Sequence, residues 1–272
     1  MTAMGATKLA EGAWGVVTGA DSGIGLEFSR ELARRGCRLV MVSNRADTLE
    51  KAAAAVAAEF HTRTLPLELD LCRHDAAAVL MDFLDSHAIQ PEVMINNAGI
   101  FSFREVCATG SERVNAFIDL HVRAVTESSR LMARRMAARG SGYILNMSSM
   151  SCWTPMPGIA LYAATKAYIR VFSRALAYEM RPAGVKVMVA CPGGIATDLF
   201  GLPDRLKRLA VNIGALYTPQ RFVRKAVDRL LKGRPQYING MMNRIGIVAV
   251  GMAPAPLRMM VKTKLLDRGI TR

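Results

Sequence analysis

The chain has 272 residues, of which 51% are hydrophobic and 21% charged, a balance typical of a compact globular protein and not of a disordered one. This length allows one α/β domain with a sizeable core. The first 14 residues contain no apolar core of signal-peptide length, and no apolar run is long enough to span a bilayer. We therefore expect a cytoplasmic protein with a single domain over residues 1–272.

The positive charge is concentrated late in the chain. The net charge is +14, and the residues from Gly201 onward contain 15 Lys or Arg against 3 Asp. Such a segment suits nucleic acid, an anionic membrane surface or an acidic ligand, or it is a solvated face that keeps the protein soluble. We favour the solvated face, and we expect no nucleic-acid binding because no aromatic residues alternate with these charges.

The five cysteines are odd in number and scattered along the chain, at positions 37, 72, 107, 152 and 191. None forms a closely spaced pair of the kind that binds zinc, and none stands beside a histidine as a nucleophile would. We expect reduced thiols in a cytosolic setting and no metal site.

The first unit along the chain has the order of a phosphate-binding turn. Ala13 to Thr18 predicts a strand, and a helix to about Arg35 opens within the glycine-rich turn that follows it. Backbone N–H groups of such a turn meet the positive end of the helix dipole, and its glycines let a pyrophosphate approach closely. The spacing is T-G-x-x-x-G-x-G, with Gly19, Gly23 and Gly25 as its glycines.

The end of the second strand, Arg38 to Ser43, indicates which cofactor fits. An acidic residue there would bind the adenosine ribose 2′-hydroxyl, whereas a basic residue accommodates a 2′-phosphate. This chain has Asn44 and Arg45 after Ser43 and no Asp or Glu. The pattern favours NADP(H), with NAD(H) as the second choice, unless Arg45 simply faces solvent.

Helices and strands alternate through the rest of the first 200 residues. The predicted helices are Asp47 to Phe60, Asp75 to His87, Ser111 to Arg139 and Leu161 to Met180, and the predicted strands are Arg63 to Leu69, Val93 to Asn96, Tyr143 to Met147 and Lys186 to Cys191. This alternation predicts an α/β fold: a Rossmann-like, doubly wound parallel sheet with helices on both faces. Ligands of such sheets bind at the carboxyl ends of the strands.

Two further motifs follow predicted strands at that edge. Asp70 is placed to accept a hydrogen bond from an adenine amino group or, alternatively, to cap the next helix. The run Asn96 to Gly99 offers a small, flat backbone beneath a bound nucleotide.

Tyr162 and Lys166 lie four residues apart in a predicted helix, so they share one of its faces. A phenol has a pKa near 10 and is a poor acid or base at neutral pH. A nearby ammonium favours the phenolate and is expected to lower that pKa. Ser149, in a serine-rich turn after the preceding strand, is placed to hydrogen-bond the same substrate oxygen. The arrangement suits proton transfer to a carbonyl or from an alcohol.

Together these motifs resemble the short-chain dehydrogenase/reductase family, in its subgroup with the T-G-x-x-x-G-x-G loop, over roughly Ala13 to Thr197. The resemblance implies that Tyr162 is the general acid/base, that Lys166 lowers its pKa and holds the nicotinamide ribose, and that Ser149 orients the substrate oxygen. Hydride would then pass between the nicotinamide and the carbonyl carbon.

The resemblance also implies a set of cofactor-binding residues. The glycine-rich loop with Ser22 and Ile24 would hold the pyrophosphate, Asp70 and Leu71 the adenine, and Asn97 and Ala98 the ribose. Ile195 and Thr197 would lie near the nicotinamide amide. The full expected set is Gly19, Ser22, Gly23, Ile24, Gly25, Asn44, Arg45, Asp70, Leu71, Asn97, Ala98, Gly99, Tyr162, Lys166, Pro192, Gly193, Ile195 and Thr197.

One position departs from the family pattern. Family members usually carry an Asn 28 residues before the active-site Ser to anchor a water in the proton relay, and this chain has His121 there. An imidazole titrates near neutrality and would also relay protons. The alternative is a buried histidine whose hydrogen bonds are satisfied by the protein.

The last third of the chain bears on the substrate. Residues 198–215 are expected to form a mobile flap with a mainly apolar lining, or one that packs only on itself. Residues 240–272 form a basic, apolar extension that suits an interfacial amphipathic segment, although a core or dimer-contact helix would have the same composition.

The sequence thus predicts an NADP(H)-dependent oxidoreductase that reduces a ketone, or oxidises the secondary alcohol, on a hydrophobic, lipid-like or steroid-like substrate. The alternative is a non-catalytic NAD(P)-sensing binding protein of the same fold. By the resemblance we also expect a homodimer or homotetramer that contacts through the two long helices. Peripheral membrane contact through the C-terminal segment is a further hypothesis.

Overall fold

The computed structural model describes residues 9–195, 217–252, 254–261 and 263. Within them lies one seven-stranded sheet in the order β3-β2-β1-β4-β5-β6-β7, and every neighbouring pair is parallel. The strands are β1 (Trp14–Thr18), β2 (Arg38–Ser43), β3 (Thr64–Glu68), β4 (Pro91–Asn96), β5 (Gly142–Met147), β6 (Val185–Ala190) and β7 (Gln236–Tyr237). The predicted doubly wound α/β fold is confirmed.

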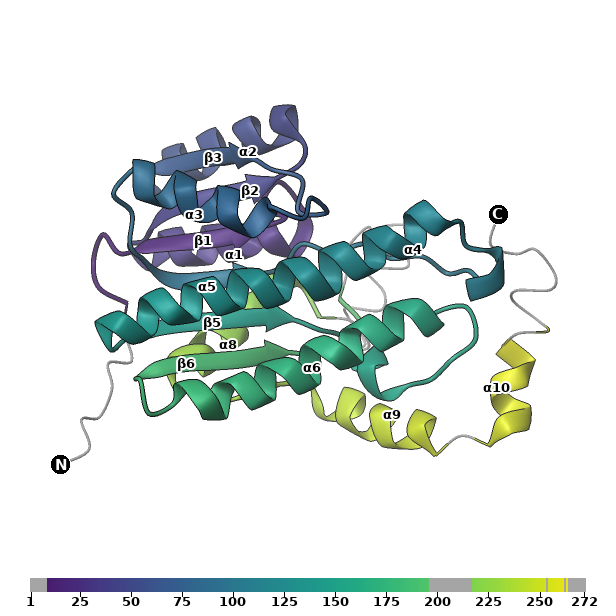
Figure 1. Cartoon of the computed structure of the whole chain (residues 1–272). Helices are drawn as coiled ribbons and strands as arrows, with labels where there is room; N and C mark the ends of the chain where they lie inside the picture. The colour runs from purple at the N-terminus through teal and green to yellow at the C-terminus, as the bar shows by residue number, and fades with distance from the viewer. Residues whose placement is uncertain (1–8, 196–216, 253, 262, 264–272) are drawn as a thin grey trace.

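Helices cover both faces of the sheet (Figure 1). One layer holds α1 (Gly23–Arg34), α2 (Ala46–Phe60) and α8 (Pro219–Leu231); the other holds α3 (Ala76–Ser86), α4 (Ser111–Ile118), α5 (Ala124–Arg139) and α6 (Ala160–Met180). Two further helices, α9 (Met241–Gly251) and α10 (Ala255–Val261), lie outside these layers. No helix among the described residues combines the length and apolarity needed to cross a bilayer.

The strands are apolar on both sides because both faces of the sheet are covered. All five residues of β1 are buried. Val17 packs in the core beneath α1, α2 and α8, whereas its neighbour Val16 packs in the core beneath α3, α5 and α6. Alternate residues of one strand therefore stabilise two separate cores.

Two segments differ from the sequence prediction. The long helix expected over Ser111 to Arg139 is interrupted by a π turn at Asp119–Arg123, between α4 and α5. The other segment is α8, which no motif had indicated. Its apolar side is fully buried, whereas Arg221, Arg224 and Lys225 are exposed. Part of the late basic charge is thus the solvated outer face of an amphipathic helix.

The position of β1 determines where a ligand can bind. β1 lies between β2 and β4. The chain continues from β1 to β2 and β3 on one side of it, and then crosses to β4, β5 and β6 on the other side. This reversal of strand order opens a crevice at the carboxyl ends of β1 and β4, the usual ligand site of open α/β sheets.

Candidate active site

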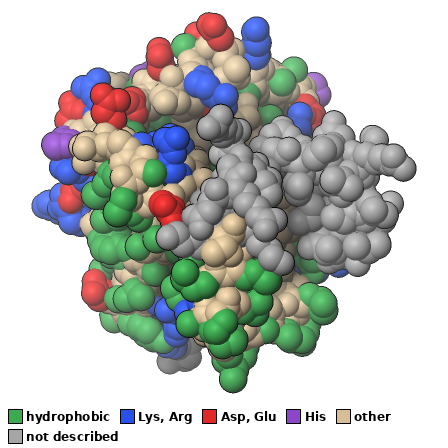
Figure 2. All heavy atoms as spheres, turned by 90° about the vertical axis from the view of Figure 1, so that its right-hand side faces the viewer, with side chains coloured by type: hydrophobic (Ala, Val, Ile, Leu, Met, Phe, Trp, Pro, Cys, Tyr) green, Lys and Arg blue, Asp and Glu red, His purple; other side chains and the backbone are tan. Residues whose placement is uncertain are grey.

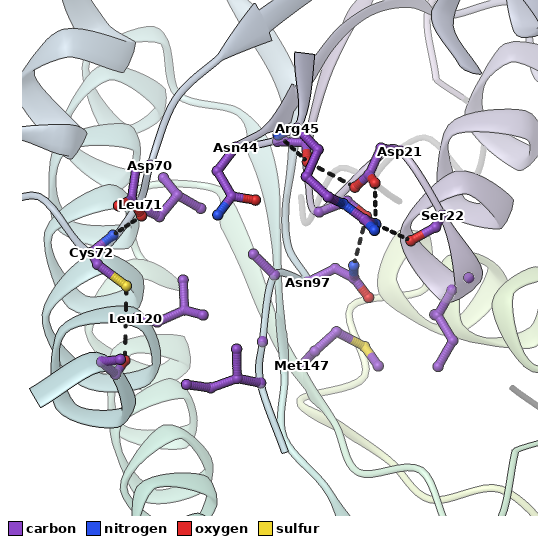
Figure 3. A pocket seen from close by; sticks show the side chains of 18 of the residues that line it. Asp21, Ser22, Asn44, Arg45, Asp70, Leu71, Cys72, Asn97, Leu120 and Met147 are labelled. Atoms are coloured by element: carbon purple, nitrogen blue, oxygen red, sulfur yellow. Dashed lines mark hydrogen bonds and ion pairs between the residues drawn. The ribbon is translucent and has the colours of Figure 1, made fainter. Parts of the chain in front are cut away.

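A pocket of about 630 Å³ occupies this crevice (Figure 3). It extends from the glycine-rich loop and the end of β2 to the buried face of α6. Most of the residues that the sequence assigns to a dinucleotide line it, and they are Gly19, Ser22, Gly23, Ile24, Asn44, Arg45, Asp70, Leu71, Asn97, Ala98, Gly99, Tyr162, Lys166 and Pro192. The volume and the lining both fit an extended dinucleotide.

The backbone of the glycine-rich loop lets neighbouring groups and a ligand come close to it. Gly19 and Gly23 have φ values of 62° and 55°, which favour glycine. A Cβ at Gly25 would overlap the Gly19 carbonyl and lie 2.6 Å from Asn97 Nδ2. The Ser22 hydroxyl accepts a hydrogen bond from Arg45 (2.9 Å) instead of capping α1. The first-turn N–H groups of α1 are therefore left for a ligand, and the loop fits a pyrophosphate.

Thr18 hydrogen-bonds to the segment after β4 at the bottom of the pocket. Its hydroxyl oxygen accepts hydrogen bonds from the backbone N–H groups of Asn97 and Ala98, both at 3.0 Å. Asn97 Nδ2 donates in return to the Thr18 carbonyl oxygen (3.0 Å). The carboxyl ends of β1 and β4 are thus joined below the place where the nucleotide would lie.

Asp70 lies at the adenosine end of the pocket, but it does not cap the next helix. Its Oδ1 accepts from the Cys72 N–H at 2.9 Å, within the turn that follows β3. Asp75 is the residue at the N-cap position of α3. The capping alternative is therefore wrong as stated, and the exposed Asp70 carboxylate keeps an oxygen for an adenine amino group.

Tyr162 and Lys166 line the other end of the pocket, and Ser149 lies next to Tyr162. The Tyr162 phenol is hydrogen-bonded to Ser149. The Lys166 Nζ donates to the Met147 carbonyl oxygen (3.0 Å) and lies 5.6 Å from the centroid of the Tyr162 ring. The i, i+4 spacing on α6 thus places phenol and ammonium on the same side of the helix. Ser149 itself is fixed because its hydroxyl also accepts from the Ser151 N–H (3.2 Å).

The pKa of Tyr162 does not shift in the direction expected from the neighbouring Lys166. Burial raises the pKa of Tyr162 above its ordinary value, and only the Ser149 hydrogen bond opposes that shift. The ring packs edge-on against Phe101 and Phe117, at centroid distances of 5.1 and 6.5 Å. Burial also lowers the pKa of Lys166, to about 8. Desolvation is thus the largest cause of both shifts, and it favours the neutral phenol at neutral pH.

His121 lies fully buried at the π turn, where both ring nitrogens have protein partners. Its Nε2 accepts from the Ile100 N–H (3.1 Å), so Nδ1 carries the proton and donates to Thr165 Oγ1 (3.0 Å). Burial, reinforced by the positive charges of Lys166 and Arg113, lowers the pKa of His121 to about 2. This geometry favours the packing alternative over a proton relay.

We expect His121→Asn to affect stability and not turnover. The substitution should lower the free energy of unfolding at pH 7.5 by about 2 kcal/mol, because buried groups lose partners. In the wild type the unfolded imidazole binds a proton below its ordinary pKa of about 6.5 and the folded one does not. His121 therefore contributes stability above that pH, and it is lost on acidification at about 1.4 kcal/mol per pH unit.

Urea unfolding of both proteins at pH 7.5 and 5.5 measures this difference. His74→Asn, at a position whose side chain is 73% exposed, is the matched control and should leave both values unchanged. A loss of turnover on the order of 100-fold in folded His121→Leu, a side chain that can neither carry a proton nor anchor a relay water as Asn does, would instead support the relay.

Three of the expected cofactor residues, Gly25, Gly193 and Ile195, do not line the pocket, and a fourth, Thr197, is not among the described residues. Gly193 does not line the pocket, and its N–H donates to Asn239 Oδ1 at 2.7 Å. Ile195 is buried in the core beneath α1, α2 and α8. Thr197 and the flap predicted over 198–215 lie outside the described residues.

The structure adds Asp21 to the pocket, a residue that the sequence analysis passed over as a variable position of the loop motif. Its acidic side chain beside a phosphate site, and the basic Arg45 after the next strand, were the available signal. No group of three or more His, Cys, Asp or Glu side chains suited to a metal ion occurs among the residues described.

Comparison with known families identifies this arrangement. The family model for short chain dehydrogenase matches residues 14–204, which includes the glycine-rich loop, Ser149, Tyr162 and Lys166. The chain belongs to the short-chain dehydrogenase family. It is accordingly an NAD(P)-dependent dehydrogenase or reductase, with a nicotinamide cofactor.

Among related sequences, very-long-chain 3-oxoacyl-CoA reductase-B of Danio rerio is 29% identical over 252 residues, covering 90% of this chain and 78% of that protein. The 17-beta-hydroxysteroid dehydrogenase type 3 of Mus musculus is 31% identical over 191 residues, covering 69% of this chain and 62% of that protein.

Among solved structures, a 7beta-hydroxysteroid dehydrogenase aligns with a TM-score of 0.80 and 27% identity, over 88% of this chain and 92% of that chain. A short-chain dehydrogenase from Sphingobium yanoikuyae in complex with NADPH aligns with a TM-score of 0.76 and 25% identity, over 93% of this chain and 96% of that one. These structures have the fold described above.

Proposed function

We propose that this short-chain dehydrogenase is an NADPH-dependent reductase of a ketone on a hydrophobic, lipid-like or steroid-like substrate. The observation that carries the proposal is the geometry around Tyr162, whose buried ring lies 5.6 Å from the Lys166 Nζ and packs edge-on against aromatic rings. Arg45 supports the choice of NADPH, because it is the basic residue at the end of β2 and lines the pocket. The names of the relatives support a lipid or steroid substrate.

The roles of the side chains follow from their contacts. The Ser149 hydroxyl and the Tyr162 phenol together hold the carbonyl oxygen of the substrate, and the phenol gives its proton to that oxygen as the alcohol forms. Lys166, fixed by the Met147 carbonyl, keeps a positive charge beside the phenolate that remains. The nicotinamide, when bound, supplies the hydride. Burial around Tyr162 excludes water from the transfer.

The raised pKa of Tyr162 predicts a difference between the two directions of the reaction. Reduction needs the phenol and the Lys166 ammonium, whose pKa is about 8, so its kcat/KM should be nearly flat between pH 6 and 7 and begin to fall towards pH 8. Oxidation of the alcohol needs the phenolate, whose population rises about tenfold per pH unit below the pKa. Initial rates in both directions over this range measure the two profiles. A flat oxidation profile would mean that the phenolate is already formed and that the raised pKa is wrong.

The surroundings of Ser149 favour an apolar substrate. A short helix, η3 (Met150–Trp153), begins directly after Ser149, and α9 packs against it. A Cβ at Gly246 of α9 would lie 4.0 Å from Met150 Cε, and one at Gly251 would lie 3.9 Å from the Trp153 carbonyl oxygen. The segment directly after Ser149 is therefore covered by the apolar helix α9, which favours an apolar substrate body over a sugar.

A substrate series tests this proposal. NADPH consumption is followed with 3-oxoacyl thioesters of increasing chain length, with ketosteroids and with a keto sugar. We expect kcat/KM to rise by up to about fourfold per added methylene, the value of one buried CH2, and to be lowest for the sugar. A preference for the keto sugar, or no dependence on chain length, would contradict an apolar site.

We also propose that α9 contacts a membrane surface and that the outer faces of α5 and α6 form an oligomer contact. Exposed apolar side chains gather on α9, namely Met241, Met242, Ile245 and Val248, and Val171 and Tyr178 are exposed on α6. Figure 2 shows apolar side chains gathered on the lower part of the face that it presents. Sedimentation with anionic vesicles tests the first contact, and light scattering the second; a monomer that does not bind vesicles would contradict both.

A further inference from the structure

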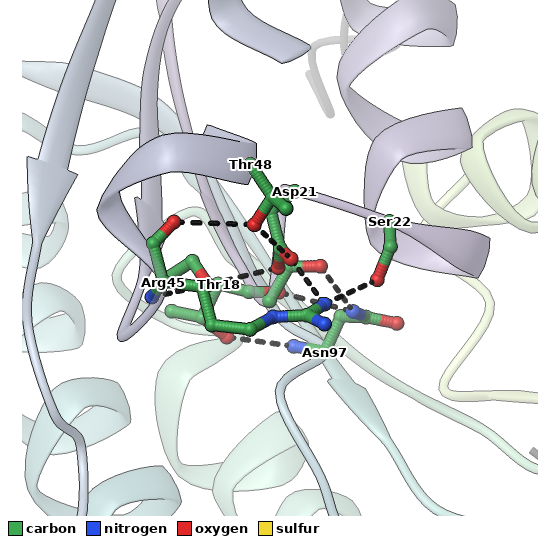
Figure 4. Close-up of polar contacts among 8 residues, drawn as sticks. Thr18, Asp21, Ser22, Arg45, Thr48 and Asn97 are labelled. Carbon is green, nitrogen blue, oxygen red and sulfur yellow. Dashed lines mark hydrogen bonds and ion pairs between the residues drawn. The ribbon is translucent and has the colours of Figure 1, made fainter. Parts of the chain in front are cut away.

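The glycine-rich loop carries a buried carboxylate at a place where a dinucleotide brings its own negative charge. The Asp21 side chain is only 4% exposed. Its Oδ1 accepts from the Ser43 hydroxyl (2.8 Å), and its Oδ2 accepts from the Thr48 hydroxyl (3.1 Å) and from Arg45 Nη2 (Figure 4). Three donors from β2 and the segment after it therefore hold this carboxylate in one position.

Arg45 reaches from the end of β2 across to the loop. The same Nη2 that binds Asp21 also donates to the Ser22 hydroxyl at 2.9 Å. The arginine side chain is 57% exposed, so a ligand in the pocket can reach it. Figure 3 shows the guanidinium directed towards Asp21 and Ser22, with Asn44, Asp70 and Leu71 on the adenosine side of the pocket.

This ion pair affects the two cofactors differently. A 2′-phosphate binds the Arg45 guanidinium, so it must share that group with Asp21. It is then also close to the negative charge of the Asp21 carboxylate. A 2′-hydroxyl carries no charge and leaves the pair undisturbed. Like charges at this range repel, and a partly buried pair is only weakly screened by salt. Repulsion between Asp21 and the pyrophosphate is common to both cofactors, so the difference that Asp21 makes between them comes from the 2′-phosphate.

We propose that Asp21 is a specificity-determining residue that limits the preference of this enzyme for NADP(H) by holding Arg45 in an ion pair that a 2′-phosphate must share. The inference rests on the proposed use of NADP(H) and adds the residue that moderates it. Removal of the Asp21 charge frees the guanidinium and strengthens the preference.

Two nucleotides that differ only in the 2′-phosphate isolate this effect. Calorimetric titration of the full chain with adenosine 2′,5′-bisphosphate and with 5′-AMP needs neither a nicotinamide nor a substrate. Asp21→Asn keeps the size of the side chain and removes its charge. We expect it to increase the affinity for the bisphosphate about tenfold and to change the affinity for AMP by less than about twofold. A tenfold change is in the range measured for close charge pairs.

Arg45→Gln provides the opposite arm. It should weaken the bisphosphate about tenfold and affect AMP little. Adding Asp21→Asn to it should then bring a smaller gain than in the wild type, because no guanidinium is left to free and only the repulsion by the carboxylate is removed. Asp47→Asn is the matched control, since Asp47 is an exposed carboxylate two residues from Arg45. It should leave the ratio of the two affinities unchanged.

Three results would overturn the inference: equal tightening of both nucleotides in Asp21→Asn, a ratio unchanged within twofold, or an Asp47→Asn variant with the same effect. Asp21→Ser, which also lacks the charge but keeps a hydroxyl, replaces Asp21→Asn if thermal unfolding shows that the latter is not folded. A failure of the ketone-reductase proposal would appear only in turnover and would leave these nucleotide affinities as expected.

Discussion

Tyr162→Phe should lose about 10²–10⁴-fold in ketone reduction, the contribution of a positioned general acid, while NADPH binding changes little. The substitution removes one oxygen atom and keeps the ring, which is 7% exposed and packs against Phe101 and Phe117. Only the proton donor and one of the two groups that hold the carbonyl oxygen are lost. Steady-state NADPH oxidation and a separate fluorescence titration of bound NADPH measure the two effects.

Tyr168→Phe is the matched control, because Tyr168 lies on the same helix and its hydroxyl contacts Thr126 (2.8 Å) at an exposed position. It should retain wild-type turnover. If the wild type binds NADPH but reduces no ketone, and Tyr162→Phe binds it equally well, the alternative of a non-catalytic NAD(P)-sensing protein is favoured. Full activity in Tyr162→Phe would remove the phenol from the mechanism.

Gly25→Ala should weaken dinucleotide binding by about 100-fold or more. An added Cβ would overlap the Gly19 carbonyl oxygen and lie 2.6 Å from Asn97 Nδ2. Both neighbours are fixed, since Asn97 is hydrogen-bonded to Thr18 at the end of β1. The loop must therefore shift away from α1, and a displacement of about 1 Å in a positioning segment is enough for a loss of this size.

Calorimetric titration with NADPH measures the loss. Gly110→Ala is the control, because a Cβ there meets nothing within 4 Å and the backbone φ of −65° suits any residue. It should bind as the wild type does. Unchanged binding in Gly25→Ala would show that the pyrophosphate does not lie on this loop.

The sequence was sufficient for the order and type of the elements through β6, since each strand is a short apolar run and each helix has its own apolar stripe. It was also sufficient for the glycine-rich loop and for the shared side of Tyr162 and Lys166, because both follow from spacing along the chain. Helix α8 is harder to predict, because its basic residues raise the charge of the segment and mask the buried apolar side of an amphipathic helix.

Other features depend on contacts between distant segments. The π turn at Asp119–Arg123 has no marker in the local sequence, since it exists where His121 meets Ile100 and Thr165. The direction of the Tyr162 pKa shift depends on how deeply tertiary packing buries the ring, whereas spacing reports only that an ammonium is near. The Asp21–Arg45 pair joins residues 24 positions apart, across the first βαβ unit.

The hydrogen bonds of His121 continue into α6 and limit how that helix can turn. Thr165 Oγ1, which accepts from the imidazole, donates in turn to the Tyr162 carbonyl oxygen at 2.9 Å. Successive residues of an α-helix are about 100° apart around its axis, so a slip of one residue would swing the phenol out of the crevice. The hydrogen bond from His121 to Thr165 thus restricts rotation of α6 about its axis. It keeps the Tyr162 phenol directed into the crevice without contacting the phenol hydroxyl.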